Sequence, residues 1–206
     1  MAIVIHYAPQ TRAIIALWAL EEVGVPYEKV KLDFKAGEHK SEAFTKVNPN
    51  QKLPAMVVDG RPMFESTAMV IWLAERFGTE KKLWPEPNDP ARAQALGWTV
   101  WGMVQLGMDI AQLMVASHDF SPKEMHNEAQ AKSAREHIDK DLGVLDAQLA
   151  KHAHVMGEAF SLADVLPATA MMFAMQAKLD LSKFPHIQAW MQRVMKREAL
   201  ARAQAL

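Results

Sequence analysis

The sequence contains no cysteine among its 206 residues. This absence excludes disulfide bonds, thiolate metal ligands and a cysteine nucleophile. The chain also lacks an uninterrupted apolar run of about 18 residues, which a membrane-spanning helix requires. Its first residues have neither the basic region nor the long apolar region of a signal peptide. We therefore expect a cytoplasmic protein that has no membrane partner.

Neither sign of charge is in excess, because the chain has 23 basic and 24 acidic residues and a formal net charge of -1. No global basic field attracts nucleic acid or an anionic membrane surface. The eight histidines show no spacing that supplies three zinc ligands, so no metal site is expected. Glycine-rich phosphate loops and the serine-hydrolase elbow are absent as well. The expected partners are therefore small molecules or other protein chains.

What the first part of the chain does contain is a regular alternation of short β-branched runs with helical patterns. The order is β-α-β followed by β-β-α, with a helix predicted over 12–23 and another over 66–77. A strand, a crossover and a second strand predict a parallel pair, whereas Asp59-Gly60 predicts an antiparallel hairpin. The strands are expected at 3–6, 27–32, 55–58 and 62–64. Alternating polarity over 27–32 is typical of a half-buried strand.

The second part of the chain reads as helix throughout. Asp89-Pro90 is a helix start with proline in the first turn, and Ser121-Pro122-Lys123-Glu124 and Ser161-Leu162-Ala163-Asp164 have the form of capping boxes. Helices are expected from 89 to about 116, from 121 to about 150, and over 162–178, 185–194 and 196–205. The stretch between the two parts is rich in proline and charge. We predict an α/β domain over 1–78, a linker over 79–88 and an all-α domain over 89–206.

Two short motifs in the first part could bind an amino-acid derivative. If the bond before Pro54 is cis, the Leu53 backbone faces outward and can pair with an extended peptide. The alternative is an ordinary trans proline at the start of a strand. Glu65-Ser66 lies at a strand-to-helix junction, where free amides and a hydroxyl suit a carboxylate and Glu65 suits an ammonium group. The alternative here is that Ser66 only caps its own helix.

The order and spacing of several motifs resemble those of the cytosolic glutathione S-transferase family, in a bacterial type whose class stays open. They are Asn48-Pro49-Asn50-Gln51-Lys52-Leu53-Pro54-Ala55, the run Phe64-Glu65-Ser66-Thr67-Ala68, and the capping motif Phe160-Ser161-Leu162-Ala163-Asp164. The resemblance spans nearly the whole chain. It implies a thioredoxin-like α/β N-terminal domain followed by an all-α C-terminal bundle.

The same resemblance implies which residues bind glutathione. The proline matching Pro54 is cis in the family, and the backbone of the residue matching Leu53 pairs with the cysteinyl part of the tripeptide. We call Leu53-Pro54 together with Glu65-Ser66 the dock, because the residues matching Glu65 and Ser66 hold the γ-glutamyl group. Residues at the positions of His39, Gln51 and Lys52 commonly reach the glycine carboxylate. The alternative for each of these three is a solvated side chain.

Catalysis in such a protein requires a lower pKa of the bound thiol, which is about 3 % ionised at pH 7 when its pKa is near 8.5. A hydroxyl donor and the positive end of the first helix could both lower it. Thr11 is the first candidate for that hydroxyl and Tyr7 the second, although relatives carry a tyrosine, serine or cysteine in this loop. Arg12 could add positive field or pair with an acidic residue, and Thr11 could serve only as an N-cap.

The function we predict is conjugation of the glutathione thiolate, with glutathione as co-substrate, to a small hydrophobic electrophile, by a homodimer. One face of the long helix carries a stripe that could line the electrophile pocket, or could be core or dimer contact. Its members are Trp98, Trp101, Gln105, Met108 and Gln112. Two alternative functions stay open. One is glutathione-dependent reduction of disulfides or peroxides, and the other is non-catalytic binding of a ligand or a protein.

Overall fold

The computed structural model describes residues 1–119 and 121–206, which form two compact units. The first comprises Met1–Trp84 together with Arg197–Leu206, and the second comprises Pro85–Lys196. The last ten residues therefore belong to the α/β unit, because they make most of their contacts with it. The division by sequence into 1–78, 79–88 and 89–206 stays a prediction. Within the described ranges, no helix is both long and apolar enough to cross a membrane.

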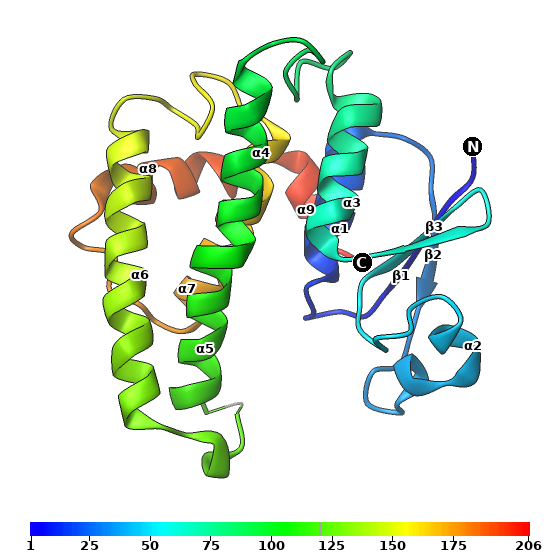
Figure 1. Cartoon of the computed structure of the whole chain (residues 1–206), viewed down its shortest axis with the longest axis horizontal. Coiled ribbons are helices and arrows are strands. Elements are labelled where there is room, and N and C mark those ends of the chain that lie inside the picture. The colour runs from blue at the N-terminus through cyan, green and yellow to red at the C-terminus, as the bar shows by residue number, and fades with distance from the viewer. Residues whose placement is uncertain (120) are drawn as a thin grey trace. The chain divides into compact units, whose positions relative to one another are not determined.

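The first unit is built on a four-stranded sheet in the order β2-β1-β3-β4 (Figure 1). The β1–β2 pair is parallel, while the β1–β3 and β3–β4 pairs are antiparallel, as the sequence predicts. Asp59 and Gly60 both have positive φ in the turn that joins β3 to β4. The strands are β1 (Ile3–Tyr7), β2 (Glu28–Lys31), β3 (Ala55–Val58) and β4 (Arg61–Phe64).

Helices cover both faces of this sheet. Figure 1 shows α1 and α3 side by side on one face and α2 on the other. The side chains of Ile3, Ile5 and Tyr7 are buried toward α1, whereas His6, between them, packs its ring against Phe44 of α2. The helical elements are α1 (Ala13–Val23), a 3-10 turn η1 (Glu38–Lys40), α2 (Glu42–Thr45), α3 (Ser66–Leu73), a π-helical turn η2 (Ala74–Gly78) and α9 (Glu198–Gln204).

Two local expectations for the first unit are wrong. All four residues of β2 are exposed, because β2 is an edge strand, and alternating polarity had predicted a half-buried one. Ser66 is the first residue of α3 rather than its cap. Glu65 occupies the N-cap position, and no side chain caps the helix there.

Every named element of the second unit is helical among the residues described, and an isolated β-bridge joins His154 to Gly157. Its elements are α4 (Ala91–Trp101), a π-helical segment η3 (Gly102–Gly107), α5 (Met108–Ser117), a 3-10 turn η4 (Lys123–Met125), α6 (Glu128–Leu149), a 3-10 turn η5 (Leu162–Asp164), α7 (Val165–Gln176) and α8 (Pro185–Val194). The predicted capping box at Ser161–Asp164 is present. Asp164 is fully buried and also accepts hydrogen bonds from the Val155 amide and the Trp190 indole.

The predicted capping box at Ser121 is wrong. The Ser121 hydroxyl donates instead to the carbonyl of Val115, and α6 begins seven residues later. Its cap is Asn127, whose side-chain oxygen accepts the backbone N–H of Gln130 at 3.0 Å.

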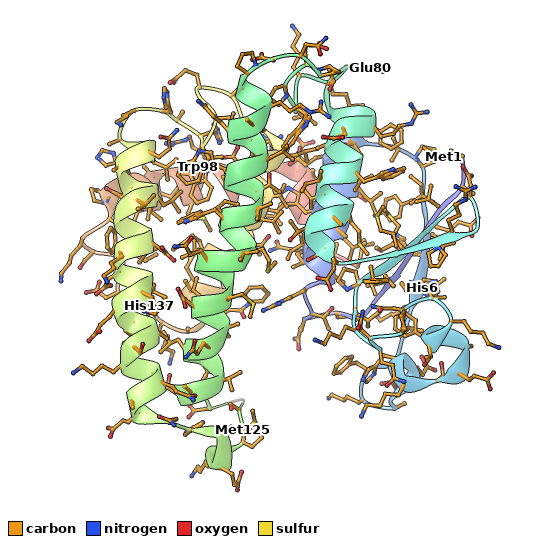
Figure 2. The ribbon with its side chains drawn as sticks, in the orientation of Figure 1. Met1, His6, Glu80, Trp98, Met125 and His137 are labelled. Atoms are coloured by element: carbon orange, nitrogen blue, oxygen red, sulfur yellow. The ribbon has the colours of Figure 1, made fainter. Side chains whose placement is uncertain are left out.

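The stripe that begins at Trp98 runs over α4, η3 and α5 and is not core. Trp98, which is labelled in Figure 2, and Trp101 are half-buried and meet edge to face, with ring centroids 5.2 Å apart. Met108 is exposed. The buried face of the same helix carries residues such as Thr99 and Leu106. The interpretation of the stripe as core is therefore wrong.

Candidate functional site

Strand pairing brings the two halves of the dock to the same edge of the sheet. Ala55, directly after Pro54, pairs with Phe64, directly before Glu65. On its other side Ala55 pairs with His6, so the end of β1 lies beside the same two segments. The Leu53–Pro54 peptide bond is cis, as the family resemblance implies. Motifs twelve residues apart in the chain therefore share one end of neighbouring strands.

The Leu53 backbone is free to pair with a ligand. Neither its N–H nor its carbonyl forms a hydrogen bond to any described residue. The turn before it is self-contained, because the Asn48 side chain donates to the Lys52 carbonyl at 2.7 Å and accepts the Asn50 amide at 3.0 Å. Half-buried backbone groups without partners are costly unless water or a ligand satisfies them. Leu53 therefore presents one donor and one acceptor in an extended segment, as strand addition requires.

The other half of the dock is the start of α3. Ser66 is 8 % exposed, and its hydroxyl bonds to no described residue. The amides of the first helical turn have no partner within the helix and carry partial positive charge. Glu65 is exposed with φ of 72°, a conformation that costs a side chain-bearing residue on the order of 1–3 kcal/mol. An unusual backbone angle at this junction supports a ligand-binding role for it.

Of the residues predicted to reach the glycine carboxylate, Lys52 is the best placed. It is exposed, directly precedes Leu53 and has no ion pair among the described residues. Gln51 donates from its side-chain amide to the Thr45 hydroxyl at 3.1 Å. His39 is 8 % exposed and stacks on Phe34, with ring centroids 4.1 Å apart. Within the described ranges, no hydrogen bond, ion pair or ring contact joins His39 to the dock.

The loop after β1 holds the candidates for thiol activation. The Thr11 hydroxyl donates its only proton to the Ala8 carbonyl at 2.7 Å and accepts the Ala13 amide at 3.2 Å. It could donate to a thiolate only after leaving Ala8. Tyr7 is 6 % exposed, and its hydroxyl has no hydrogen bond to a described residue. Arg12 occupies the N-cap position of α1, is exposed and has no ion pair in the described part of the chain.

Metal chemistry has no support at this site. Among residues 1–119 and 121–206, no three histidine or acidic side chains lie close enough together to hold a metal ion. The donors assembled here are backbone amides, hydroxyls and cationic side chains. Such a set binds anions and peptide groups.

Comparison with known proteins shows the family of the chain. Residues 3–75 match the glutathione S-transferase N-terminal domain, and residues 106–198 match the C-terminal domain of the same family. The chain belongs to the glutathione S-transferase family. The N-terminal match includes the dock and the loop after β1.

Individual relatives are distant but cover most of the chain. The Escherichia coli glutathione S-transferase GstB is 29 % identical over 89 % of this chain and 88 % of its own length. The probable glutathione S-transferase GSTF1 of rice is 29 % identical, over 97 % and 93 %. A glutathione transferase from Burkholderia graminis, solved with two glutathione molecules per subunit, is 26 % identical with a TM-score of 0.85, over 98 % of this chain and 87 % of that one.

Two further residues of this glutathione S-transferase family member support the site, and sequence reasoning gave them no role. Asn48 is 2 % exposed and fixes the turn that precedes Leu53; its only sequence signal is its place before Pro49. His6 lies beside Ala55 and points toward α2 (Figure 2). Burial lowers the pKa of His6, and its buried Nδ1 has no partner in the described structure.

Proposed function

We propose that this chain binds glutathione at the dock, holds it as the thiolate and joins the thiolate sulfur to a carbon of a hydrophobic electrophile. The observation that carries the proposal is the unpaired Leu53 backbone beside the free start of α3. An extended tripeptide could satisfy the Leu53 N–H and carbonyl with its central residue. Its γ-glutamyl carboxylate would then meet Ser66 and the first-turn amides, and its ammonium group would meet Glu65.

The glycine carboxylate at the other end of the tripeptide needs a cation. In this proposal Lys52 supplies it, since that side chain is exposed and adjacent to Leu53. Arg12, Gln51 and His39 remain candidates for the same group or for the positive field around the thiol. Because Lys52 is flexible and solvated, we expect its loss to weaken glutathione binding by only about two- to fivefold.

The chemical step would be a nucleophilic attack. The thiolate sulfur donates an electron pair to an electrophilic carbon, a sulfur–carbon bond forms, and a leaving group departs with its own electron pair. A shift of about two units in the thiol pKa, or roughly 2.7 kcal/mol, makes most of the bound thiol nucleophilic at pH 7. Tyr7, Thr11 and the first turn of α1 are the proposed sources of that shift.

Ultraviolet titration of bound glutathione tests this activation. The thiolate absorbs where the thiol does not, so an absorbance titration gives the pKa of the bound thiol directly. Tyr7→Phe and Thr11→Val each remove one hydroxyl with little change in shape, and Thr11→Ser retains the hydroxyl as a matched control. The responsible residue is the one whose loss raises the thiol pKa. If neither variant raises it, both hydroxyl assignments are wrong.

A second candidate function is glutathione-dependent disulfide reduction, favoured by the two glutathione molecules in the Burkholderia graminis relative. The first thiolate would attack a disulfide sulfur and release one thiolate. A second glutathione would then resolve the mixed disulfide, leaving oxidised glutathione and the second thiolate. Parallel assays with an aryl halide and with a mixed glutathione disulfide distinguish the two functions.

The third candidate is non-catalytic glutathione binding, favoured by the engaged proton of Thr11. It predicts that glutathione binds while its thiol pKa stays near 8.5. The proposal also includes a cytoplasmic homodimer. Light scattering coupled to gel filtration measures the mass of the assembly, and a monomer would contradict that part.

A further inference from the structure

The helical unit contains a cavity of about 370 Å³ that no step of the proposed reaction uses. It lies among α5, α6 and the connection from α7 to α8, and α5 and α6 run side by side in Figure 1. Its apolar lining includes Leu113, Leu142 and the half-buried Met114. The volume is within the range of small-molecule sites, roughly 300–1,000 Å³.

The rim of this cavity is charged, and its cations outnumber its acids. Arg135, Lys178 and Lys183 line it together with Asp139 and Asp180. Asp180 is already engaged, since it accepts the Ser182 amide at 2.9 Å and its pKa is lowered mainly by hydrogen bonds from Ser182, with a smaller contribution from Lys183. The rim therefore favours a ligand with a single negative charge.

None of the three cations forms an ion pair with a described residue. Arg135 and Asp139 are one helical turn apart on α6, yet no ion pair joins them or involves Lys178 in the described part of the chain. A cation beside apolar lining residues binds an anion most tightly when the apolar part of that anion also fills the space between those residues.

The backbone at Lys178 adds an independent observation. Lys178 has φ of 55° at the end of α7, where its N–H bonds to the Met175 carbonyl and the next amide bonds to Ala174. Glycine is the usual residue at this position of such a helix end. This left-handed helix end fixes where the Lys178 side chain leaves α7, at the rim of the cavity.

We propose that this cavity binds an organic monocarboxylate with a compact apolar body. The body would occupy the space beside Leu113, Met114 and Leu142, and the carboxylate would meet Arg135 and Lys178 at the rim. This site requires neither the dock nor a thiol. It therefore stands whether or not the proposed transferase function does.

Titration with naphthalene-2-carboxylate, followed by nuclear magnetic resonance of methionine methyl groups, tests this proposal without glutathione and again with saturating glutathione. The Met114 signal, assigned from Met114→Leu, should shift saturably in both conditions. The signal of Met56, which is buried in the other unit, should not shift. The neutral naphthalene-2-carboxamide should bind at least about threefold more weakly, because it cannot pair with the rim cations.

The chain supplies a matched control for Lys178. Lys82 also has positive φ at a helix end, with the same two hydrogen bonds, from its own amide to Thr79 and from the next amide to Gly78. Lys178→Gly should weaken binding about threefold or more without lowering the melting temperature, and Lys82→Gly should leave binding unchanged. An unmoved Met114 signal, equal affinity for the carboxamide, or equal losses in the two glycine variants would each overturn the proposal.

Discussion

Removing the guanidinium of Arg197 should destabilise the α/β unit far more than removing that of Arg202. Both residues lie at the C-terminal end of the chain and bind acidic residues of α1. Arg197 forms two hydrogen bonds to the Glu22 carboxylate, at 2.5 and 2.7 Å, and the Glu22 side chain is only 4 % exposed. The Trp18 indole donates to the same carboxylate at 2.8 Å. Arg197→Met would leave this buried charge without its cationic partner.

The size of the loss follows from how buried each ion pair is. Breaking a buried pair costs about 3–5 kcal/mol, and an exposed pair contributes about 0–1 kcal/mol. The Arg197 side chain is 29 % exposed, so we expect Arg197→Met to cost about 2–3 kcal/mol. Arg202 is 53 % exposed in its pair with Glu21, and Arg202→Met should therefore cost about 1 kcal/mol or less.

Equilibrium unfolding in urea measures both losses, with hydrogen exchange of the α1 amides to locate them. The double variant Glu22→Gln with Arg197→Met should be more stable than Arg197→Met alone, because it leaves no buried charge unpaired. The reasoning would be refuted if Arg197→Met lost no more stability than Arg202→Met. It would also be refuted if the double variant were the least stable of the series.

Three further predictions concern stability. Burial raises the pKa of Asp141, whose Oδ2 has no partner among the described residues, so its charged form costs stability above that raised pKa. Asp141→Asn should therefore be more stable by roughly 1 kcal/mol at pH 7, a gain that disappears as pH falls toward 4 in urea titrations. Gly102→Ala should cost about 1–3 kcal/mol by thermal unfolding, because its Cβ would lie 2.6 Å from the Pro167 backbone nitrogen. Lys178→Gly and Lys82→Gly should each raise the free energy of unfolding by about 0.5–1 kcal/mol, since both relieve a positive φ.

Local patterns predicted most elements of the fold because most of its signals are local. Gly24 ends α1 in the left-handed conformation, and the hairpin at Asp59-Gly60 joins β3 to β4 as expected. The start of α6 was mispredicted because the sequence offers two caps six residues apart. Ser121 heads one capping pattern, while Asn127 with Gln130 three residues later heads another. Nothing local reveals that Ser121 binds the Val115 carbonyl instead.

Long-range contacts explain the remaining differences. The alternating polarity of β2 cannot reveal that the strand lies at the edge of the sheet, because that depends on which strands pair. The grouping of residues 197–206 with the first unit depends on Arg197 meeting Glu22, 175 positions earlier in the chain. Sequence periodicity carries no information about such pairs.

The same distinction between local patterns and long-range contacts applies to the candidate site. The family resemblance implied the cis geometry at Pro54, which the structure has, and strand pairing places Pro54 and the Glu65-Ser66 junction at one sheet edge. The state of the Thr11 hydroxyl depends on a rotamer and on the position of the Ala8 carbonyl. The sequence shows that a hydroxyl is present in the loop, but not where its proton goes.

Recognition and activation in the proposed function therefore rely on different kinds of group. Recognition uses the Leu53 backbone and the start of α3, which nearly any side chain at position 53 would preserve. Activation needs one hydroxyl proton directed at sulfur, and in this structure the Thr11 proton is directed at Ala8. A fold of this kind can keep its affinity for glutathione while its thiol chemistry changes. For that reason the pKa of the bound thiol, rather than affinity for glutathione, separates non-catalytic binding from the two catalytic functions.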